Sequence, residues 1–364
     1  MLKSTAINLL LCASALWGAG HKTQNVIILM SDGVRWQDVF EGVDPQLLTA
    51  DNAHSDNIPR LKRQFARPNA KEQRRALMPF LWSEIAKKGQ IYGNRALDSD
   101  VHVANGLQFS YPGYSETLCG FVDPKLNTND KIPNPNVTVL EWLWQKDAYK
   151  NRIAAFSPWG VMPYILNTER SAFYVNAGYD LMLAPPVTPE IEMLNRIRLE
   201  TASWDGEVLD APVFYTALAY WKLHKPKVLF ISLGDTDVFG HDGRYDLYLE
   251  AVHRYDDYAR LAWETAQSMD EYKGKTTLIL AVDHGRGNGE SDWIGHGLKH
   301  PDSKNTWFAV IGPDTPAKGE RAKTQPITQT QFAATIATLL GEDYNSAVPQ
   351  AGKPIADVVG RSIR

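Results

Sequence analysis

The chain has 364 residues, of which 44% are hydrophobic and 22% are charged, and its formal net charge at pH 7 is −4. This composition excludes an intrinsically disordered chain, and the lack of excess positive charge argues against nucleic acid as a stable partner. The length suits one large α/β domain or two small ones.

The first 20 residues are typical of a secretory signal peptide. Lys3 supplies a positive charge, an apolar run follows over residues 6–16, and small residues up to Gly20 offer cleavage sites. A buried N-terminal helix is the alternative. We expect residues 1–20 to be removed from a periplasmic or secreted protein, with residues 21–364 forming a single domain. Cleavage would leave Cys119 as the remaining cysteine, which excludes an intramolecular disulfide.

Five continuous apolar runs, each bounded by turn residues, predict strands that are buried on both faces. They cover residues 25–31, 152–157, 227–234, 276–282 and 307–312. Segments with a helical pattern lie between them, at residues 77–88, 137–146, 190–201, 213–224, 244–269 and 330–340. This alternation predicts an α/β fold, namely a three-layer α/β/α sandwich with a mainly parallel central sheet.

Two segments are predicted to be insertions that cap the sheet. Residues 44–75 are polar and become basic toward their end, whereas residues 158–210 are rich in Tyr, Trp and Pro. For any single residue in either segment, solvated surface is the alternative to substrate contact. Beyond the N-terminus no segment is apolar and long enough to cross a bilayer, so no transmembrane anchor is expected.

Acidic residues follow three of the predicted strands. Asp32 follows the first run, Asp235 and Asp237 follow the third, and Asp283 follows the fourth with His284 beside it. In open parallel sheets, ligands bind beyond the carboxyl ends of the strands. One such aspartate is commonly a turn residue or a helix cap, but three strands that deliver carboxylates to one edge indicate a metal site.

The spacing of the histidines sharpens this interpretation. Asp237 and His241 lie four residues apart, Asp283 and His284 are adjacent, and His296 lies between two glycines. Carboxylate oxygen together with imidazole nitrogen suits zinc, and also manganese or iron. Calcium would favour oxygen ligands alone.

Ser110 is the candidate nucleophile. It lies just before Pro112, and proline is favoured in the first turn of a helix, so Ser110 is expected at a strand-to-helix junction near the positive helix end. Metal coordination can activate a serine hydroxyl, which is otherwise a weak nucleophile. A plain helix cap is the alternative, and Ser115 and Thr117 are the next candidates for the nucleophile.

The ordered set of motifs resembles the alkaline phosphatase superfamily. The set comprises DGVRWQ after the first strand, Ser before Pro at a helix start, D-x-x-x-H, DHG and a later HG. The order is most similar to the type I phosphodiesterase/nucleotide pyrophosphatase branch and related bacterial phosphatase-like proteins. The resemblance implies that one metal is held by Asp32, Ser110, Asp283 and His284, and a second by Asp237, His241 and His296.

The resemblance also implies the activity. The chain would be a phosphoester hydrolase that acts on small molecules through a phosphoserine at Ser110, with two divalent ions, most readily Zn²⁺. Asn129 would donate to a phosphoryl oxygen. The alternatives are a sulfatase or phosphonate hydrolase of the same superfamily and a non-catalytic, metal-stabilised binding protein. The C-x-P-x-R motif that sulfatases usually carry is absent at Cys119.

Several points stay open at this stage. His300 competes with His296 for the second metal, and Gly113-Tyr114 follows the proline where relatives commonly have Asn-His. The sequence does not decide between monoesters and diesters, nor does it give the oligomeric state. Candidate contributors to that specificity are Arg35, Trp36, Tyr111, Arg170 and Lys299.

Overall fold

The computed structural model describes residues 21–360 with the exception of 54, 56 and 205, so the predicted signal peptide lies outside the described residues. An eight-stranded sheet runs through the centre in the order β11-β2-β10-β9-β1-β8-β4-β5. Its strands are β1 (Asn25–Ser31), β2 (Gln90–Tyr92), β4 (Ile153–Ser157), β5 (Tyr174–Ala177), β8 (Val228–Leu233), β9 (Thr276–Val282), β10 (Phe308–Ile311) and β11 (Gly319–Glu320). Two small sheets pair β3 (Val101–His102) with β12 (Ile327–Thr328) and β6 (Ala202–Trp204) with β7 (Glu207–Val208).

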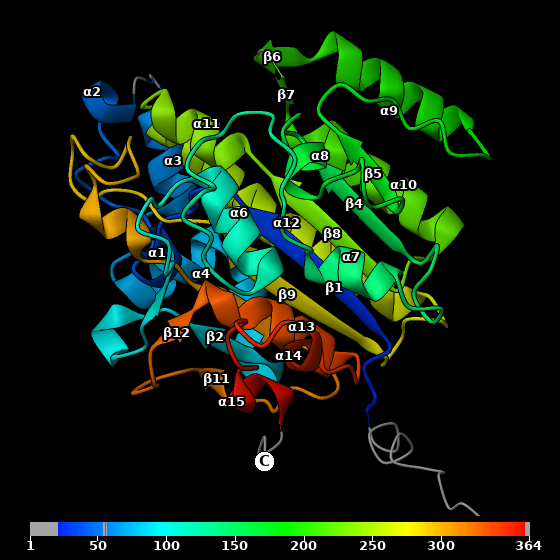
Figure 1. Cartoon of the computed structure of the whole chain (residues 1–364). Coiled ribbons are helices and arrows are strands. Elements are labelled where there is room, and N and C mark those ends of the chain that lie inside the picture. Colours follow the sequence, from blue (N-terminus) through cyan, green and yellow to red (C-terminus); the bar gives the residue numbers. More distant parts are fainter. Residues whose placement is uncertain (1–20, 54, 56, 205, 361–364) are drawn as a thin grey trace, which may run out of the picture.

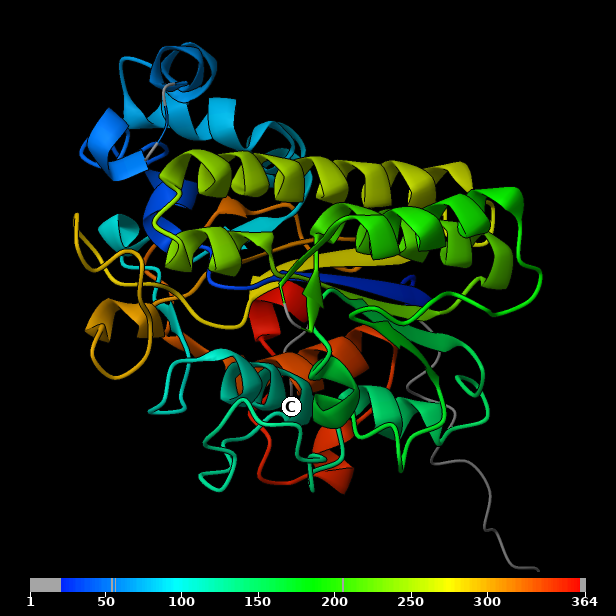
Figure 2. The same cartoon turned by 90° about the horizontal axis from the view of Figure 1, so that it is seen from above.

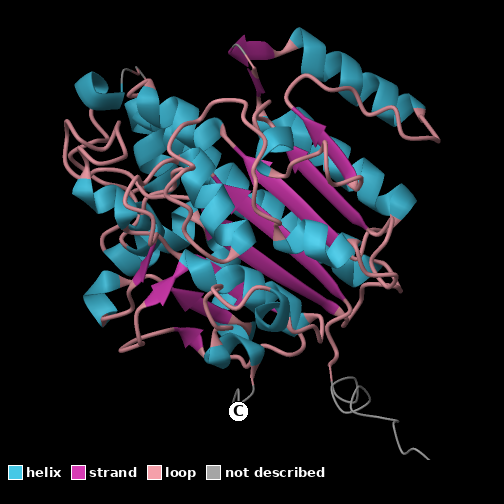
Figure 3. Ribbon diagram, viewed as in Figure 1, coloured by secondary structure: helices cyan, strands magenta, loops and turns pink. Residues whose placement is uncertain are grey.

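Helices cover both faces of the central sheet, as Figures 1 and 2 show. One face carries α10 (Asp210–His224), α11 (Asp235–His241) and α12 (Tyr245–Ser268), and the other carries α6 (Ser110–Cys119), α7 (Val139–Trp144) and α13 (Phe332–Leu339). The remaining α-helices are α1 (Trp36–Phe40), α2 (Ala50–Ala53), α3 (Ile58–Phe65), α4 (Ala70–Leu77), α5 (Ala86–Lys88), α8 (Met162–Ile165), α9 (Pro189–Glu200), α14 (Tyr344–Ala347) and α15 (Ala356–Val359). The predicted three-layer α/β/α sandwich is confirmed (Figure 3).

Strand β1 shows why the strands read as continuous apolar runs. Its side chains alternate between the two faces of the sheet, so that Ile27 and Leu29 join the core under α12 while Val26, Ile28 and Met30 join the core under α6. All five are at most 1% exposed. A strand buried on both faces has no polar positions to alternate with.

Strand β10 runs antiparallel to β9, although the other long strands of the sheet are parallel. The chain leaves β9 at its carboxyl end and stays on that edge through residues 283–307. Because no crossover helix returns it to the opposite edge, the next strand runs back the other way. The sheet is therefore mainly parallel, as predicted, with a reversed strand that the apolar pattern did not reveal.

The two predicted insertions differ in character. Residues 44–75 form α2, α3 and most of α4, which lie together at one corner of the molecule (Figure 2). Residues 158–210 are only partly a cap, because β5 within them pairs parallel with β4 and extends the central sheet. The rest of this segment forms α8, α9 and the β6–β7 hairpin. None of the described helices combines the length and the apolar character that a bilayer span requires.

Candidate active site and metal centre

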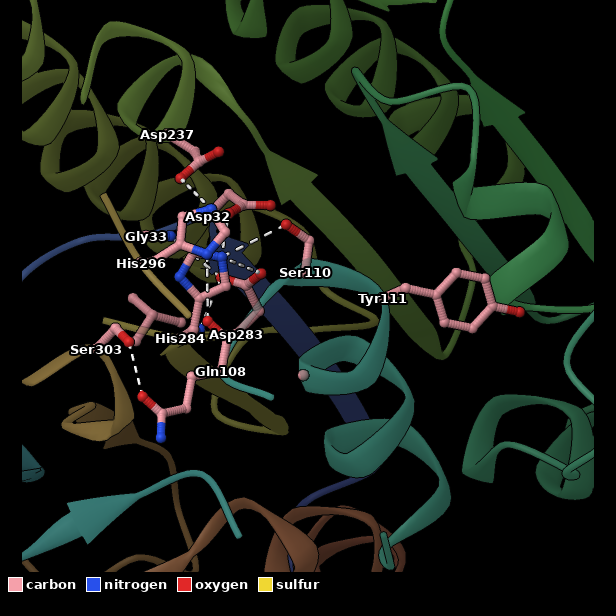
Figure 4. A network of polar contacts seen from close by, with 12 residues as sticks. Asp32, Gly33, Gln108, Ser110, Tyr111, Asp237, Asp283, His284, His296 and Ser303 are labelled. Carbon is pink, nitrogen blue, oxygen red and sulfur yellow. Dashed lines mark hydrogen bonds and ion pairs between the residues drawn. The ribbon is translucent and has the colours of Figure 1, made fainter. Parts of the chain in front are cut away.

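The candidate ligands meet at the carboxyl edge of the three central strands. Parallel pairing sets Ser31 of β1 beside Leu233 of β8 and Val282 of β9, so these strands end at the same level. The next residues along each strand are Asp32, Gly234 and Asp283, and α11 then begins at once and carries Asp237 and His241. Three strand ends thus deliver carboxylates to one point, as Figure 4 shows.

The first cluster consists of Asp32, Asp283 and His284. His284 Nε2 lies 3.1 Å from Asp32 Oδ1, 3.4 Å from Asp283 Oδ2 and 3.4 Å from Ser110 Oγ. Ligand atoms around a tetrahedral zinc ion, each about 2.1 Å from it, lie about 3.4 Å apart. The four side chains are buried, and the two carboxylate oxygens that face the centre accept no hydrogen bond of good geometry. This donor set fits a divalent ion.

Contacts behind the first cluster fix which atoms face it. Asp283 Oδ1 accepts hydrogen bonds from the backbone N–H groups of Gly33 at 3.1 Å and His284 at 2.9 Å, which leaves Oδ2 for the centre. His284 Nδ1 lies 2.8 Å from the carbonyl oxygen of Gly285 and so carries the proton. The Nε2 lone pair then faces the centre, which is how metal-binding histidines are usually oriented.

The second cluster consists of Asp237, His241 and His296. Nε2 of His241 lies 3.0 Å from Nε2 of His296 and 3.2 Å from Asp237 Oδ2, and His296 Nε2 lies 3.7 Å from Asp237 Oδ1. His296 Nδ1 lies 3.2 Å from the carbonyl oxygen of Gln108, so its Nε2 faces the cluster. The His296 ring also stacks on His284 at 4.0 Å, which puts the two clusters side by side.

The electrostatics of the two clusters differ. Burial alone would lower the pKa of His284, but the neighbouring carboxylates of Asp283 and Asp32 raise that pKa to about 10. Burial, with His284 close by, lowers the pKa of His296 to about 2. Burial would raise the pKa of Asp237, yet the guanidinium of Arg286 holds that pKa well below its usual range. The first cluster therefore binds a proton where a metal cation would lie, whereas His296 is neutral.

Ser110 is the first residue of α6 and is 6% exposed. It does not follow a strand directly, because residues 103–109 separate it from the short strand β3; the predicted strand-to-helix junction is a loop-to-helix junction. A Cβ on Gly113 would lie 2.5 Å from the carbonyl oxygen of Asp283. Gly113 thus lets α6 approach the end of β9 closely enough to place Ser110 beside His284, which explains the glycine that departs from the pattern of relatives.

The two reserve nucleophiles lie elsewhere on α6. The hydroxyl of Ser115 accepts a hydrogen bond from Asn134 at 3.1 Å, and that of Thr117 donates to the carbonyl of Gly113 at 2.9 Å. Asn129 lies close to the start of the same helix, where its Oδ1 accepts the backbone N–H of Tyr111 at 3.0 Å. That contact leaves the amide nitrogen of Asn129 without a role in holding the helix.

Other predicted residues do not join the clusters. His300 points toward Asp292, with 3.8 Å between Nδ1 and Oδ1, so of the two histidines it is His296 that lies in the second cluster. Arg35 pairs with Asp38 in the core at 2.9 Å, and Arg170 pairs with Glu141 at 2.7 Å. Further residues outside both clusters are Trp36, which packs on the core, Tyr111, whose hydroxyl donates to the carbonyl of Ile132, Lys299, which is exposed, and Asp235, which pairs with Arg254.

Two residues near the site were missed by the sequence analysis. Arg286 is fully buried and pairs with Asp237. Glu207, from the β6–β7 hairpin, lies so close to Gly234 that a Cβ there would be 2.0 Å from its carboxylate. Burial, with Asp32 and Asp237 nearby, raises the pKa of Glu207 well above its usual value. Arg286 could have been noticed from its place two residues after His284, but no pattern marks Glu207.

No protein-family profile matches the chain, and no curated protein matches its sequence. Solved structures do match. A protein in the alkaline phosphatase superfamily from Vibrio parahaemolyticus is 13% identical with a TM-score of 0.55 over 92% of this chain and 70% of its own. A 2-O GAG sulfatase is 14% identical with a TM-score of 0.55, over 93% of this chain and 74% of its own. The alkaline phosphatase PafA is 10% identical with a TM-score of 0.55, over 93% of this chain and 99% of its own. The resemblance to this superfamily is thus confirmed at the level of the fold.

Proposed function

We propose that this chain is an exported, metal-dependent hydrolase of phosphate esters that acts through a covalent intermediate on Ser110. The observation that carries the proposal is the position of Ser110 Oγ, 3.4 Å from His284 Nε2 and directly beside two clusters of ligand atoms. A helix cap would have no reason to face two such clusters. The fold supports the proposal, since the superfamily that shares it includes phosphatases and sulfatases.

Seven side chains would hold two divalent ions, and zinc suits their mixture of carboxylates and imidazoles. When bound, the two ions would supply positive charge to the serine oxygen and to the ester oxygens on either side of phosphorus. The first metal would be held by Asp32, Ser110, Asp283 and His284, and the second by Asp237, His241 and His296.

The proposed reaction has two steps, attack of Ser110 on phosphorus and hydrolysis of the phosphoserine. Ser110 Oγ loses its proton to solvent and forms a bond to phosphorus, while the bond from phosphorus to the leaving oxygen breaks on the opposite side. The N-terminal end of α6 adds a positive potential at the same place. The amide of Asn129 is free to donate to a phosphoryl oxygen, because its carbonyl oxygen already holds Tyr111. Water then cleaves the phosphoserine.

Sulfate esters are the second candidate substrate, because a sulfatase is among the solved structures with this fold. The nucleophile segment reads Ser110-Tyr111-Pro112-Gly113-Tyr114. It therefore has neither the cysteine nor the arginine of the C-x-P-x-R pattern that is usual in sulfatases, and Tyr114 is buried at the position of that arginine. This departure favours phosphate over sulfate. A binding protein without catalysis stays the third candidate.

The test is a panel of chromogenic esters given to zinc-loaded protein, namely a phosphomonoester, a phosphodiester, a phosphonate ester and a sulfate ester. We expect turnover of at least one phosphorus ester that exceeds turnover of the sulfate ester by tenfold or more. Faster turnover of the sulfate ester would make the chain a sulfatase, and no turnover of any ester would favour a binding protein. Export is tested separately, by sequencing the N-terminus of protein recovered outside the cytoplasm, which should begin near residue 21.

A further inference from the structure

Arg286 has a position that the proposed chemistry does not yet use. Its side chain has no exposed area and its guanidinium makes three contacts. Nε donates to the carbonyl oxygen of Trp293 at 2.8 Å, Nη2 donates to the carbonyl oxygen of Ile294, and Nη1 donates to Asp237 Oδ1. One rigid fork thus reaches two backbone oxygens and one carboxylate that belongs to the second cluster.

These contacts join the two segments that supply the second cluster. Asp237 and His241 belong to α11, whereas His296 belongs to the loop after β9, 55 residues beyond His241. Within residues 21–360 as described, no backbone hydrogen bond connects α11 to residues 293–297. The Arg286 fork and the ligand side chains join the two segments directly.

The packing around the guanidinium shows that the chain makes room for it. A Cβ on Gly240 would lie 2.6 Å from Arg286 Cζ, and a Cβ on Gly33 would lie 3.0 Å from Nη1. A Cβ at Gly240 would require a shift of the fork, and a Cβ at Gly33 would press on it by a few tenths of an ångström. The glycine before His241 in the D-x-x-x-H motif is therefore explained by the Arg286 guanidinium, which leaves no room for a Cβ there.

We propose that Arg286 is a positioning residue for the second metal ion. It holds the His296 loop at a fixed distance from α11 and fixes the Asp237 carboxylate, whose Oδ2 lies beside His241 and whose Oδ1 lies beside His296. This inference rests on the proposed function, because it presumes that the second cluster binds a metal. An ordinary buried ion pair would stabilise the fold as a whole and would leave the two metal sites equal in their response to its loss.

The fork matters more than the charge alone. A lysine keeps the charge but has no planar fork, so it cannot reach Asp237 and both backbone carbonyl oxygens together. A methionine removes charge and donors while it fills most of the volume. Arg254→Met is the matched control. Arg254 pairs at 3.1 Å with Asp235, which lies on α11 like Asp237 but belongs to neither cluster.

The experiment measures zinc per chain by elemental analysis, and the affinity of each equivalent by competition with a chromogenic chelator, in the full chain. Wild type should bind two equivalents, and Arg254→Met should do the same. Arg286→Met should keep the first equivalent and bind the second at least tenfold more weakly, and Arg286→Lys should lie between them. Circular dichroism establishes that each variant is folded.

Two results would overturn the inference. Arg286→Met with two equivalents at wild-type affinity would show that the fork does not position the ligands, and equal weakening of both equivalents would show a general effect on the fold. If Arg286→Met does not fold, Gly240→Ala displaces the guanidinium without removing it and should again weaken the second equivalent alone. Wild type with fewer than two equivalents would instead contradict the two-metal part of the proposed function.

Discussion

Zinc binding to the metal-free protein should release a proton from His284. The pKa of His284 is about 10 because Asp283 and Asp32 outweigh the effect of burial, so at pH 7 the metal-free protein carries a proton on this imidazole. A zinc ion needs the neutral ring. Below pH 10, the apparent zinc affinity of the first cluster should therefore increase about tenfold for each unit by which the pH is raised. Between pH 6 and pH 8 this amounts to about 100-fold.

The size of the effect follows from the same value. Three pH units separate pH 7 from a pKa of about 10, so removing the proton costs about 4 kcal/mol of the binding free energy at pH 7. His296 adds nothing to this free-energy cost, because its pKa of about 2 keeps the imidazole neutral throughout the range. The sign is fixed: affinity falls as the pH falls.

The assay is calorimetry at pH 6, 7 and 8 in buffers that differ in ionisation enthalpy, combined with chelator competition for the affinity. His224→Gln is the matched control, because His224 ends α10 at the opposite end of the sheet. The zinc affinity of this variant should change with pH as in wild type. A zinc affinity that stays constant from pH 6 to pH 8, with no proton released, would refute the reasoning.

Three substitutions test other parts of the account. Gly113→Ala places a Cβ 2.5 Å from the carbonyl oxygen of Asp283, so turnover should fall about 100-fold while unfolding free energy drops by only about 1–3 kcal/mol; normal turnover would contradict the close approach of α6. Asn129→Asp keeps the acceptor for the helix but loses the amide donor, so kcat should fall about as far as in Asn129→Ala, and an active aspartate variant would remove Asn129 from the reaction. Asp256→Ala leaves two buried backbone N–H groups without their acceptor and should cost about 2–4 kcal/mol in urea unfolding with turnover per folded molecule unchanged.

Most of the fold could be predicted because the strands are buried on both faces. Residues 26–30 and 278–282 are apolar at every position, and the strands extend these runs only by short polar residues at their ends. The direction of β10 could not be predicted, since an apolar run has no direction. Strand β5 was missed because Tyr174–Ala177 is short, and two of its residues are only partly buried.

The ligand clusters could be predicted because parallel strands end at one edge and because each motif combines a carboxylate with an imidazole. What the sequence could not show is three-dimensional closeness. Arg286 meets Asp237 across 49 residues, and Glu207 meets Gly234 from a separate hairpin. His296 and His300 lie four residues apart in the sequence, and the structure separates them, because His296 Nε2 lies 3.0 Å from His241 Nε2 whereas His300 points toward Asp292.

The central claim is that Ser110 is the nucleophile, and Ser110→Ala tests it most directly. Zinc content, thermal stability and ester turnover are measured in one preparation, with Ser115→Ala as the matched control, because the Ser115 hydroxyl faces Asn134 and Cys119 in the core. We predict that Ser110→Ala keeps its fold and most of its zinc, because Asp32, Asp283 and His284 remain, while turnover falls about 1,000-fold or more. Turnover above about a tenth of wild type in Ser110→Ala would contradict the claim.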